Sequence, residues 1–72
     1  MPKFTIKKQH VSYESTRYIK KLLADGWECV RITGSHWHFH HPIKKGIVTV
    51  PHPKKELLIK TKRSILKQAG LD

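Results

Sequence analysis

The residues best suited to chemistry lie in one short stretch, residues 34–42, which reads Gly-Ser-His-Trp-His-Phe-His-His-Pro. Four of the chain's six histidines fall within it. A free imidazole titrates at about pH 6.5, so a histidine can give or take a proton at neutral pH. The stretch therefore concentrates acid–base groups in one place. These histidines are His36, His38, His40 and His41.

Alternation within this stretch predicts a β-strand with one open face. Successive side chains of a strand point to opposite faces, so histidines at every second position share a face and the aromatic residues between them share the other. A Gly-Ser pair in front is a turn signal, and Pro42 behind interrupts the ladder. The expected open-face residues are His36, His38 and His40, and the expected core residues are Trp37 and Phe39.

Three interpretations of the histidine row follow from residue types alone. The histidines can be solvated residues on an outer sheet face, metal ligands, or acid–base groups acting on a phosphate backbone. A His-x-His pair on a strand places two imidazoles about 6–7 Å apart, as zinc sites do. Cys29 is the only thiol, so a closed zinc site would need four histidines. The five carboxylates are scattered and predict no magnesium site, so we expect no metal and no cofactor.

The length of the chain limits the number of domains, and its charge limits the kinds of binding partner. The 72 residues are enough for one domain, with 15 Lys and Arg against 5 Asp and Glu, a net charge of +10. Such a field favours RNA, DNA or a strongly acidic protein, but it also suits a ribosome-associated protein without catalysis. No apolar run approaches the roughly 20 residues of a membrane span, no signal peptide is visible, and one cysteine fits a reducing compartment. We expect a soluble, cytoplasmic protein.

The chain must supply elements that hold the histidine row, and its periodicity predicts two helices and three strands. The first helix is expected to be capped by Ser15 and to end at Gly26. A loop over residues 54–60 should lead to a second helix that Thr61 caps and Gly70 closes, with Leu71 packing back. The expected strands cover residues 27–33, 36–41 and 47–50, and short connections make them an antiparallel meander.

These elements predict an α+β fold of two layers, with both helices on one face of the sheet. Residues 1–14 can form short strand-like pieces or a flexible basic arm, and residues 15–72 form the single domain. The apolar loop residues Leu57, Leu58 and Ile59 are expected to tuck under the core. The expected core consists of Trp37, Phe39, Val48 and Val50 from the sheet and Ile19, Leu22, Leu23, Ile65 and Leu66 from the helices.

Several motifs together resemble the HicA family, small toxins of bacterial and archaeal toxin–antitoxin pairs. The similarity runs from about Ser15 to Leu71 and rests on the combination of a Gly-Ser-His motif with a characteristic closing helix. It implies a fold like the double-stranded-RNA-binding domain, endoribonuclease activity on messenger RNA, and neutralisation by a cognate HicB antitoxin. The motifs are Asp25-Gly26-Trp27, Arg31, Gly34-Ser35-His36, Phe39, His41-Pro42, Val48-Thr49-Val50-Pro51 and Thr61 to Gly70.

The resemblance implies that His36 is the catalytic residue, presented by a turn at Gly34 and Ser35. Two positions depart from the common pattern, since Trp37 replaces a frequent second histidine and Lys62 a frequent leucine. We expect a metal-independent ribonuclease toxin, and the alternative is a non-catalytic double-stranded-RNA-binding or ribosome-associated module. Candidates for phosphate contacts are Arg31, Lys44, Lys45, Lys54 and Lys55, and candidates for a second proton carrier are His38, His40 and His52.

Overall fold

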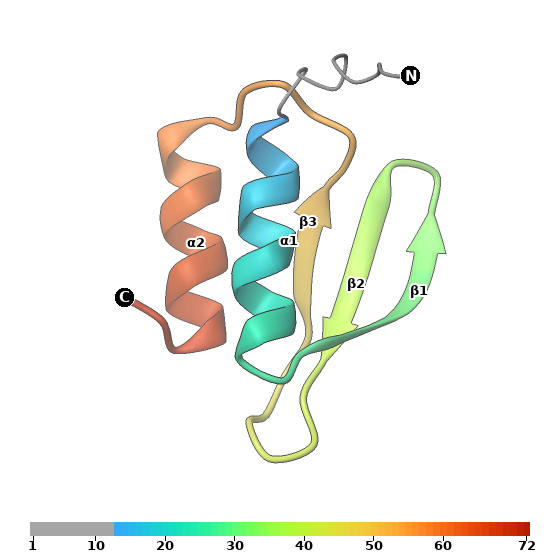
Figure 1. Ribbon diagram of the computed structural model, residues 1–72, viewed down its shortest axis with the longest axis vertical. Coiled ribbons are helices and arrows are strands. Elements are labelled where there is room, and N and C mark those ends of the chain that lie inside the picture. The colour runs from blue at the N-terminus through green and yellow to red at the C-terminus, as the bar shows by residue number, and fades with distance from the viewer. Residues whose placement is uncertain (1–12) are drawn as a thin grey trace, which may run out of the picture.

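The chain folds in the order helix, three strands, helix, as the sequence predicts (Figure 1). The computed structural model describes residues 13–72, so the two alternatives for the N-terminal arm fall almost entirely outside the described residues. Neither helix in residues 13–72 is long and apolar enough to cross a membrane. The elements are α1 (Glu14–Ala24), β1 (Glu28–Thr33), β2 (His36–His40), β3 (Val48–Pro51) and α2 (Ile59–Ala69).

The three strands form an antiparallel sheet in the order β1-β2-β3, which confirms the predicted meander. The register places Phe39 opposite Val48 and Trp37 opposite Val50, so these side chains share one face. The histidines of β2 occupy the other face, as the alternation predicts. An irregularity between Cys29 and Arg31 leaves an extra residue in β1, which is the pattern of a β-bulge.

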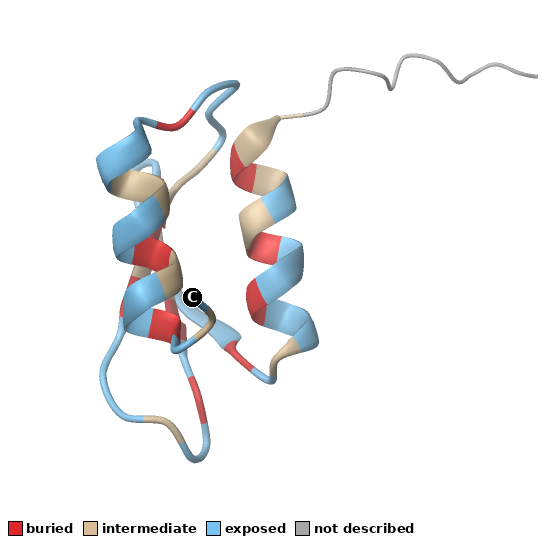
Figure 2. Ribbon diagram, turned by 90° about the vertical axis from the view of Figure 1, so that its left-hand side faces the viewer, coloured by how far each residue is buried: buried red, intermediate tan, exposed pale blue. Residues whose placement is uncertain are grey.

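Both helices pack against β3 and bury the apolar face of the sheet, whereas β1 lies farthest from them (Figure 1). Amphipathic helices and an alternating sheet must bury their apolar sides against one another, and this gives the two expected layers. Figure 2 shows the buried positions on the facing sides of the helices and the sheet. The core consists of Ile19, Leu22, Trp27, Phe39, Val48, Val50, Leu57, Ile65 and Ala69, with Trp37 partly buried beside it.

Some predicted core positions are wrong. Leu23 is 52% exposed because it lies at the edge of the α1 stripe, and of the three loop residues only Leu57 is buried. Leu58 and Ile59 are exposed because α2 starts at this point on the surface. Trp27, expected to open a strand, is instead buried just before β1, where its indole Nε1–H donates to Asp25 Oδ2 at 3.2 Å.

The predicted cap of the first helix is also wrong, because α1 begins at Glu14 and Ser15 lies within its first turn. The backbone N–H groups of Glu14 and Ser15 donate to the carbonyl oxygens of Lys55 and Lys54, at 3.0 and 3.2 Å. The loop before α2 thus satisfies donors that a side-chain cap usually satisfies. The buried Ser15 hydroxyl accepts the Lys54 N–H at 2.9 Å and lies 2.7 Å from His52 Nδ1.

The second helix differs at its start and agrees at its end. It begins at Ile59, so Thr61 lies in the first turn and is not the cap; Leu58 takes that position without a side-chain cap bond. Gly70 adopts the left-handed conformation at φ +70°, and the Leu71 N–H donates to the Leu66 carbonyl at 2.8 Å. With Leu71 packed against the core, this is the predicted Schellman closure.

Candidate active site

His36 is the first residue of β2 and lies exposed on the open face of the sheet. The preceding turn contains Gly34 at φ +58°, a left-handed conformation that glycine adopts without a Cβ penalty. The other side of this turn is tied to the end of β3, because the His52 N–H donates to the Ser35 carbonyl at 2.8 Å. The position of His36 is therefore fixed by both neighbouring strands.

His38 lies on the same face, two residues further along β2, so the rise of a strand separates it from His36 by about 6–7 Å. It is half-buried, and its Nδ1 lies 3.0 Å from the Thr49 hydroxyl of β3, which fixes the ring. Arg31 pairs with His38 across β1 and β2. The structure thus brings His36, His38 and Arg31 together on the open face, as three of the predicted site residues.

A pocket of about 300 Å³ opens beside His38. The bulge in β1 lets two consecutive residues, Val30 and Arg31, both reach this pocket, and Ile47 just before β3 supplies the opposite apolar wall. Nothing in the sequence pattern predicts this pocket. A bulge has no clear sequence signal, so Val30 could not be assigned to the open face from alternation alone.

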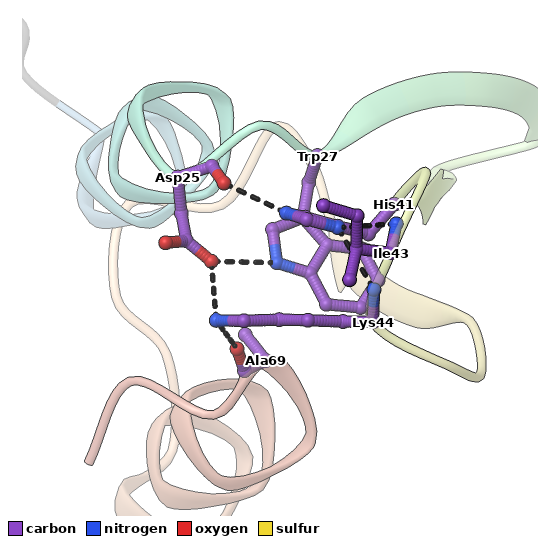
Figure 3. A network of polar contacts seen from close by, with 6 residues as sticks. All are labelled: Asp25, Trp27, His41, Ile43, Lys44 and Ala69. Atoms are coloured by element: carbon purple, nitrogen blue, oxygen red, sulfur yellow. Dashed lines mark hydrogen bonds and ion pairs between the residues drawn. The ribbon is translucent and has the colours of Figure 1, made fainter.

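His41, the fourth histidine of the cluster, is a structural residue, buried at 8% exposure in a network of polar contacts (Figure 3). Its Nε2 lies 2.8 Å from the Asp25 carbonyl oxygen, and its Nδ1 accepts the N–H groups of Ile43 and Lys44, each at 3.0 Å. Only a neutral imidazole with its proton on Nε2 satisfies all three contacts. Its ring also packs edge-on against Trp27, with 5.2 Å between centroids.

Lys44, a predicted phosphate contact, is engaged in the same network. Its Nζ donates to Asp25 Oδ2 at 2.6 Å and to the Ala69 carbonyl at 2.9 Å, and so joins the ends of the two helices (Figure 3). The hydrogen bond from Lys44, its charge and the bond from the Trp27 indole hold the pKa of Asp25 below its ordinary value of 3.8. Lys44 thus connects helix ends at the opposite end of the sheet from His36.

His52, a predicted second proton carrier, does not face His36. The residue before it, Pro51, pairs with His36, so alternation turns the His52 side chain to the helix side of the sheet. There its ring packs edge-on against Trp37 with 4.6 Å between centroids, and Nδ1 contacts the Ser15 hydroxyl. His52 connects α1 to the sheet.

The remaining predicted residues divide between the two ends of the sheet. His40 is exposed at the far end of β2, about 13 Å along the strand from His36, and Lys45 is exposed in the β2–β3 loop at that same end. Lys54 and Lys55 are exposed in the loop that leaves β3, at the end of the sheet where the His36 turn lies (Figure 1). This second pair lies at the same end of the sheet as the His36 turn, and its carbonyl oxygens accept the first N–H groups of α1.

The metal-site alternative requires several ligand side chains to converge on one point. In residues 13–72, no three histidine, cysteine, aspartate or glutamate side chains converge on a point where they could hold an ion. His38 uses Nδ1 for Thr49, and His41 uses both ring nitrogens within the protein.

Fold and site together define a small basic α+β domain that presents imidazole and guanidinium groups on an open sheet face. The family model described as HicA toxin of bacterial toxin-antitoxin matches residues 15–71. The chain therefore belongs to the HicA toxin family, whose members are toxins of toxin–antitoxin systems known as mRNA interferases. This confirms the resemblance noted in the sequence. A comparison with curated proteins finds no match.

Proposed function

We propose that this HicA toxin is a metal-independent endoribonuclease that cleaves messenger RNA with His36 as a catalytic residue. The observation that carries the proposal is the pair of imidazoles on the open face. His36 is exposed on a turn anchored by both neighbouring strands, and His38 follows on the same face with its ring held by Thr49. Two proton carriers about 6–7 Å apart can flank a single phosphate.

The reaction needs two proton transfers. The RNA 2′-hydroxyl attacks the adjacent phosphorus while one imidazole removes its proton. The phosphorus–5′-oxygen bond then breaks, and the other imidazole protonates the leaving 5′-oxygen, which leaves a 2′,3′-cyclic phosphate. Each positioned acid or base contributes about 10² to 10⁴ in rate. We assign His38 as the partner of His36, because His52 faces the helices and His40 lies too far along the strand.

Cationic groups complete the proposed site. Arg31 pairs with His38 across the sheet, so its guanidinium can stabilise the charge that develops on the phosphate oxygens. Lys54 and Lys55 lie at the same end of the sheet as the His36 turn and extend the basic surface along the RNA backbone. This division leaves Lys44 and Lys45 outside the proposed site.

Membership of a toxin–antitoxin family implies an antitoxin. We propose that a HicB-like protein covers the open face and presents acidic groups to Arg31, Lys54 and Lys55, which would also make association fast at low salt. A structure of the complex tests this. An antitoxin that binds elsewhere and leaves His36 accessible would contradict it.

Substitution of the histidines tests the enzymatic proposal. His36→Ala and His38→Ala should each lower the cleavage rate of a labelled RNA by about 10²-fold or more, because proton transfer depends on single groups. His36→Ala should leave RNA affinity unchanged, because phosphate binding is shared among many cationic groups. His40→Ala, on the same strand but out of reach, is the matched control and should cut at the parental rate. Activity should also survive EDTA.

Two outcomes would contradict the proposal. A folded His36→Ala protein that cuts RNA at the parental rate excludes His36 as catalyst. A parental protein that binds RNA but never cuts it favours the alternative, a non-catalytic RNA-binding module.

A further inference from the structure

The pocket beside His38 has features that phosphate binding does not need. Among the described residues that line it, two are apolar and exposed, Val30 at 56% and Ile47 at 49%. They come from different strands and face each other across about 300 Å³ of open space, at the lower end of the range for small-molecule sites. An exposed apolar pair in a concave surface that also carries a guanidinium and an imidazole suits a ligand with an apolar part and a polar edge.

The other two lining residues supply polar groups. Arg31 carries a planar guanidinium with five N–H donors, which can stack on a flat ring or donate to its edge. His38 has Nδ1 engaged by Thr49, which leaves the Nε2 edge of the ring toward the sheet surface. A nucleobase matches both halves of the pocket, because its faces are apolar and its edge carries hydrogen-bonding groups.

We propose that this pocket binds one unpaired base of the RNA, next to the phosphate that is cut. The inference rests on the proposed ribonuclease function, because His38 is both a pocket wall and the proposed partner of His36. A base held between Val30 and Ile47 brings its own phosphate to the two histidines. The pocket therefore positions the substrate, and it does so one nucleotide at a time because of its size.

A structural preference of the enzyme follows. In a duplex the bases are stacked and paired, so no base can enter a pocket unless it leaves the stack, which costs a few kcal/mol. A protein that binds duplex RNA by shape alone contacts phosphates and 2′-hydroxyls and needs no base pocket. The pocket thus predicts that this chain selects single-stranded RNA, although its fold resembles that of double-stranded-RNA-binding domains.

The most direct test uses the methyl signals of Val30 and Ile47 in NMR spectra of the full chain carrying His36→Ala. Titration with uridine or adenosine 5′-monophosphate should shift these signals through the ring current of the base. Ribose 5-phosphate has the same sugar and phosphate but no ring, and should leave them in place. Equal shifts with both ligands, or none with either, would overturn the proposal.

A second test compares affinities in the same His36→Ala background. Ile47→Ala removes a pocket wall and should weaken binding of a short single-stranded RNA by about tenfold, the lower limit for losing one apolar contact in a binding pocket. The matched control is Ile43→Ala, because Ile43 is 84% exposed and does not line the pocket. The His36→Ala protein should bind a duplex of the same sequence more weakly than the single strand, and neither further substitution should change that duplex affinity.

The outcomes separate the two proposals. Tighter duplex binding, or equal effects of Ile47→Ala and Ile43→Ala, excludes a base pocket while the catalytic role of His36 can still hold. If base binding shifts the Val30 and Ile47 signals but the His36→Ala variant still cuts RNA, the base pocket is supported and the catalytic role of His36 is excluded.

Discussion

His40 and His41 are neighbours in the sequence and differ in every physical respect. The His40 side chain is exposed at the end of β2, whereas His41 is buried and satisfies three backbone groups that no other side chain reaches in the described network. The ring connects the end of α1 to the turn after β2 through these hydrogen bonds. Burial of an imidazole is stabilising here because each nitrogen has a partner.

The matched pair of substitutions follows from this difference. His41→Ala should lower the free energy of unfolding by about 2–4 kcal/mol, since it leaves buried backbone groups without partners and opens a cavity beside Trp27. His40→Ala should change it by less than about 0.5 kcal/mol. Urea unfolding of both variants, with the slope checked for constancy, makes the comparison. Equal midpoints would show that the His41 contacts contribute nothing.

Gly26 depends on the same ring. Its φ of +103° strains any residue with a Cβ, and a Cβ there would lie 3.0 Å from His41 Nε2. Gly46 also has a positive φ, +87°, but a Cβ at that position would meet nothing within 4 Å. Gly26→Ala should therefore cost more stability than Gly46→Ala, which pays only the backbone strain of about 1–3 kcal/mol. Thermal unfolding measures both. A larger loss of stability in Gly46→Ala than in Gly26→Ala would show that the close approach to His41 does not add to the cost.

At the scale of elements, the start of α1 is held by the loop that leads to α2. The Glu14 carboxylate accepts the Leu57 N–H at 2.8 Å and the Lys62 Nζ at 2.9 Å, while the loop carbonyls accept the first N–H groups of the helix. The loop and the helix thus cap each other, and the segments are far apart in the sequence. A local pattern cannot reveal such a cap, which is why the two predicted caps, Ser15 and Thr61, were wrong while the glycine closure was right.

The same contacts predict weaker folding in acid. The hydrogen bond from the Leu57 N–H, and then the bond and charge of Lys62, lower the pKa of Glu14 from 4.5, and Lys44 lowers that of Asp25. The unfolded chain therefore takes up protons first as the pH falls. The stabilisation is complete above about pH 5 and is lost as the pH falls through the lowered values of the folded state.

The measurement is the free energy of unfolding between about pH 2 and 6. It should decline toward acid in the parental chain, and the decline should be shallower in Glu14→Gln and in Asp25→Asn because each removes one titrating group. Glu56→Gln is the control, since Glu56 is exposed and has no described partner within residues 13–72. A Glu56→Gln profile as shallow as the other two would contradict this account.

At the scale of the whole molecule, the sequence predicted the two-layer fold and the open histidine face because both depend on periodicity. Strand alternation alone placed His36 and His38 opposite Phe39. The roles of His41, His52 and Lys44 depend on contacts between distant segments. Their residue types suggested chemistry, whereas in the structure their hydrogen bonds and ion pairs connect one element to another. The pocket beside His38 depends on one bulged residue in β1, so it could not be predicted from the sequence either.

The net charge of +10 predicts a steep salt dependence of RNA binding. Each phosphate contact releases counterions and adds about −0.7 to the log–log slope on a single strand. Lys54→Ala combined with Lys55→Ala should make the slope shallower by about 1.4, twice the value for one contact. Lys21→Ala, an exposed position in the last turn of α1, is the control. An affinity that barely changes between low and physiological salt would contradict electrostatic binding.

The exposed β1 strand has a consequence for hydrogen exchange. All six of its residues are exposed, and the helices pack against β3, so β1 is held chiefly by its bonds to β2. Its amides should lose protection through local opening well before those of β3, which report global unfolding. Since Val30 and Arg31 belong to this strand, each opening also dismantles one wall of the pocket. A bound nucleotide would then slow exchange in β1 more than anywhere else, because its contacts with Val30 and Arg31 hold this strand in the sheet.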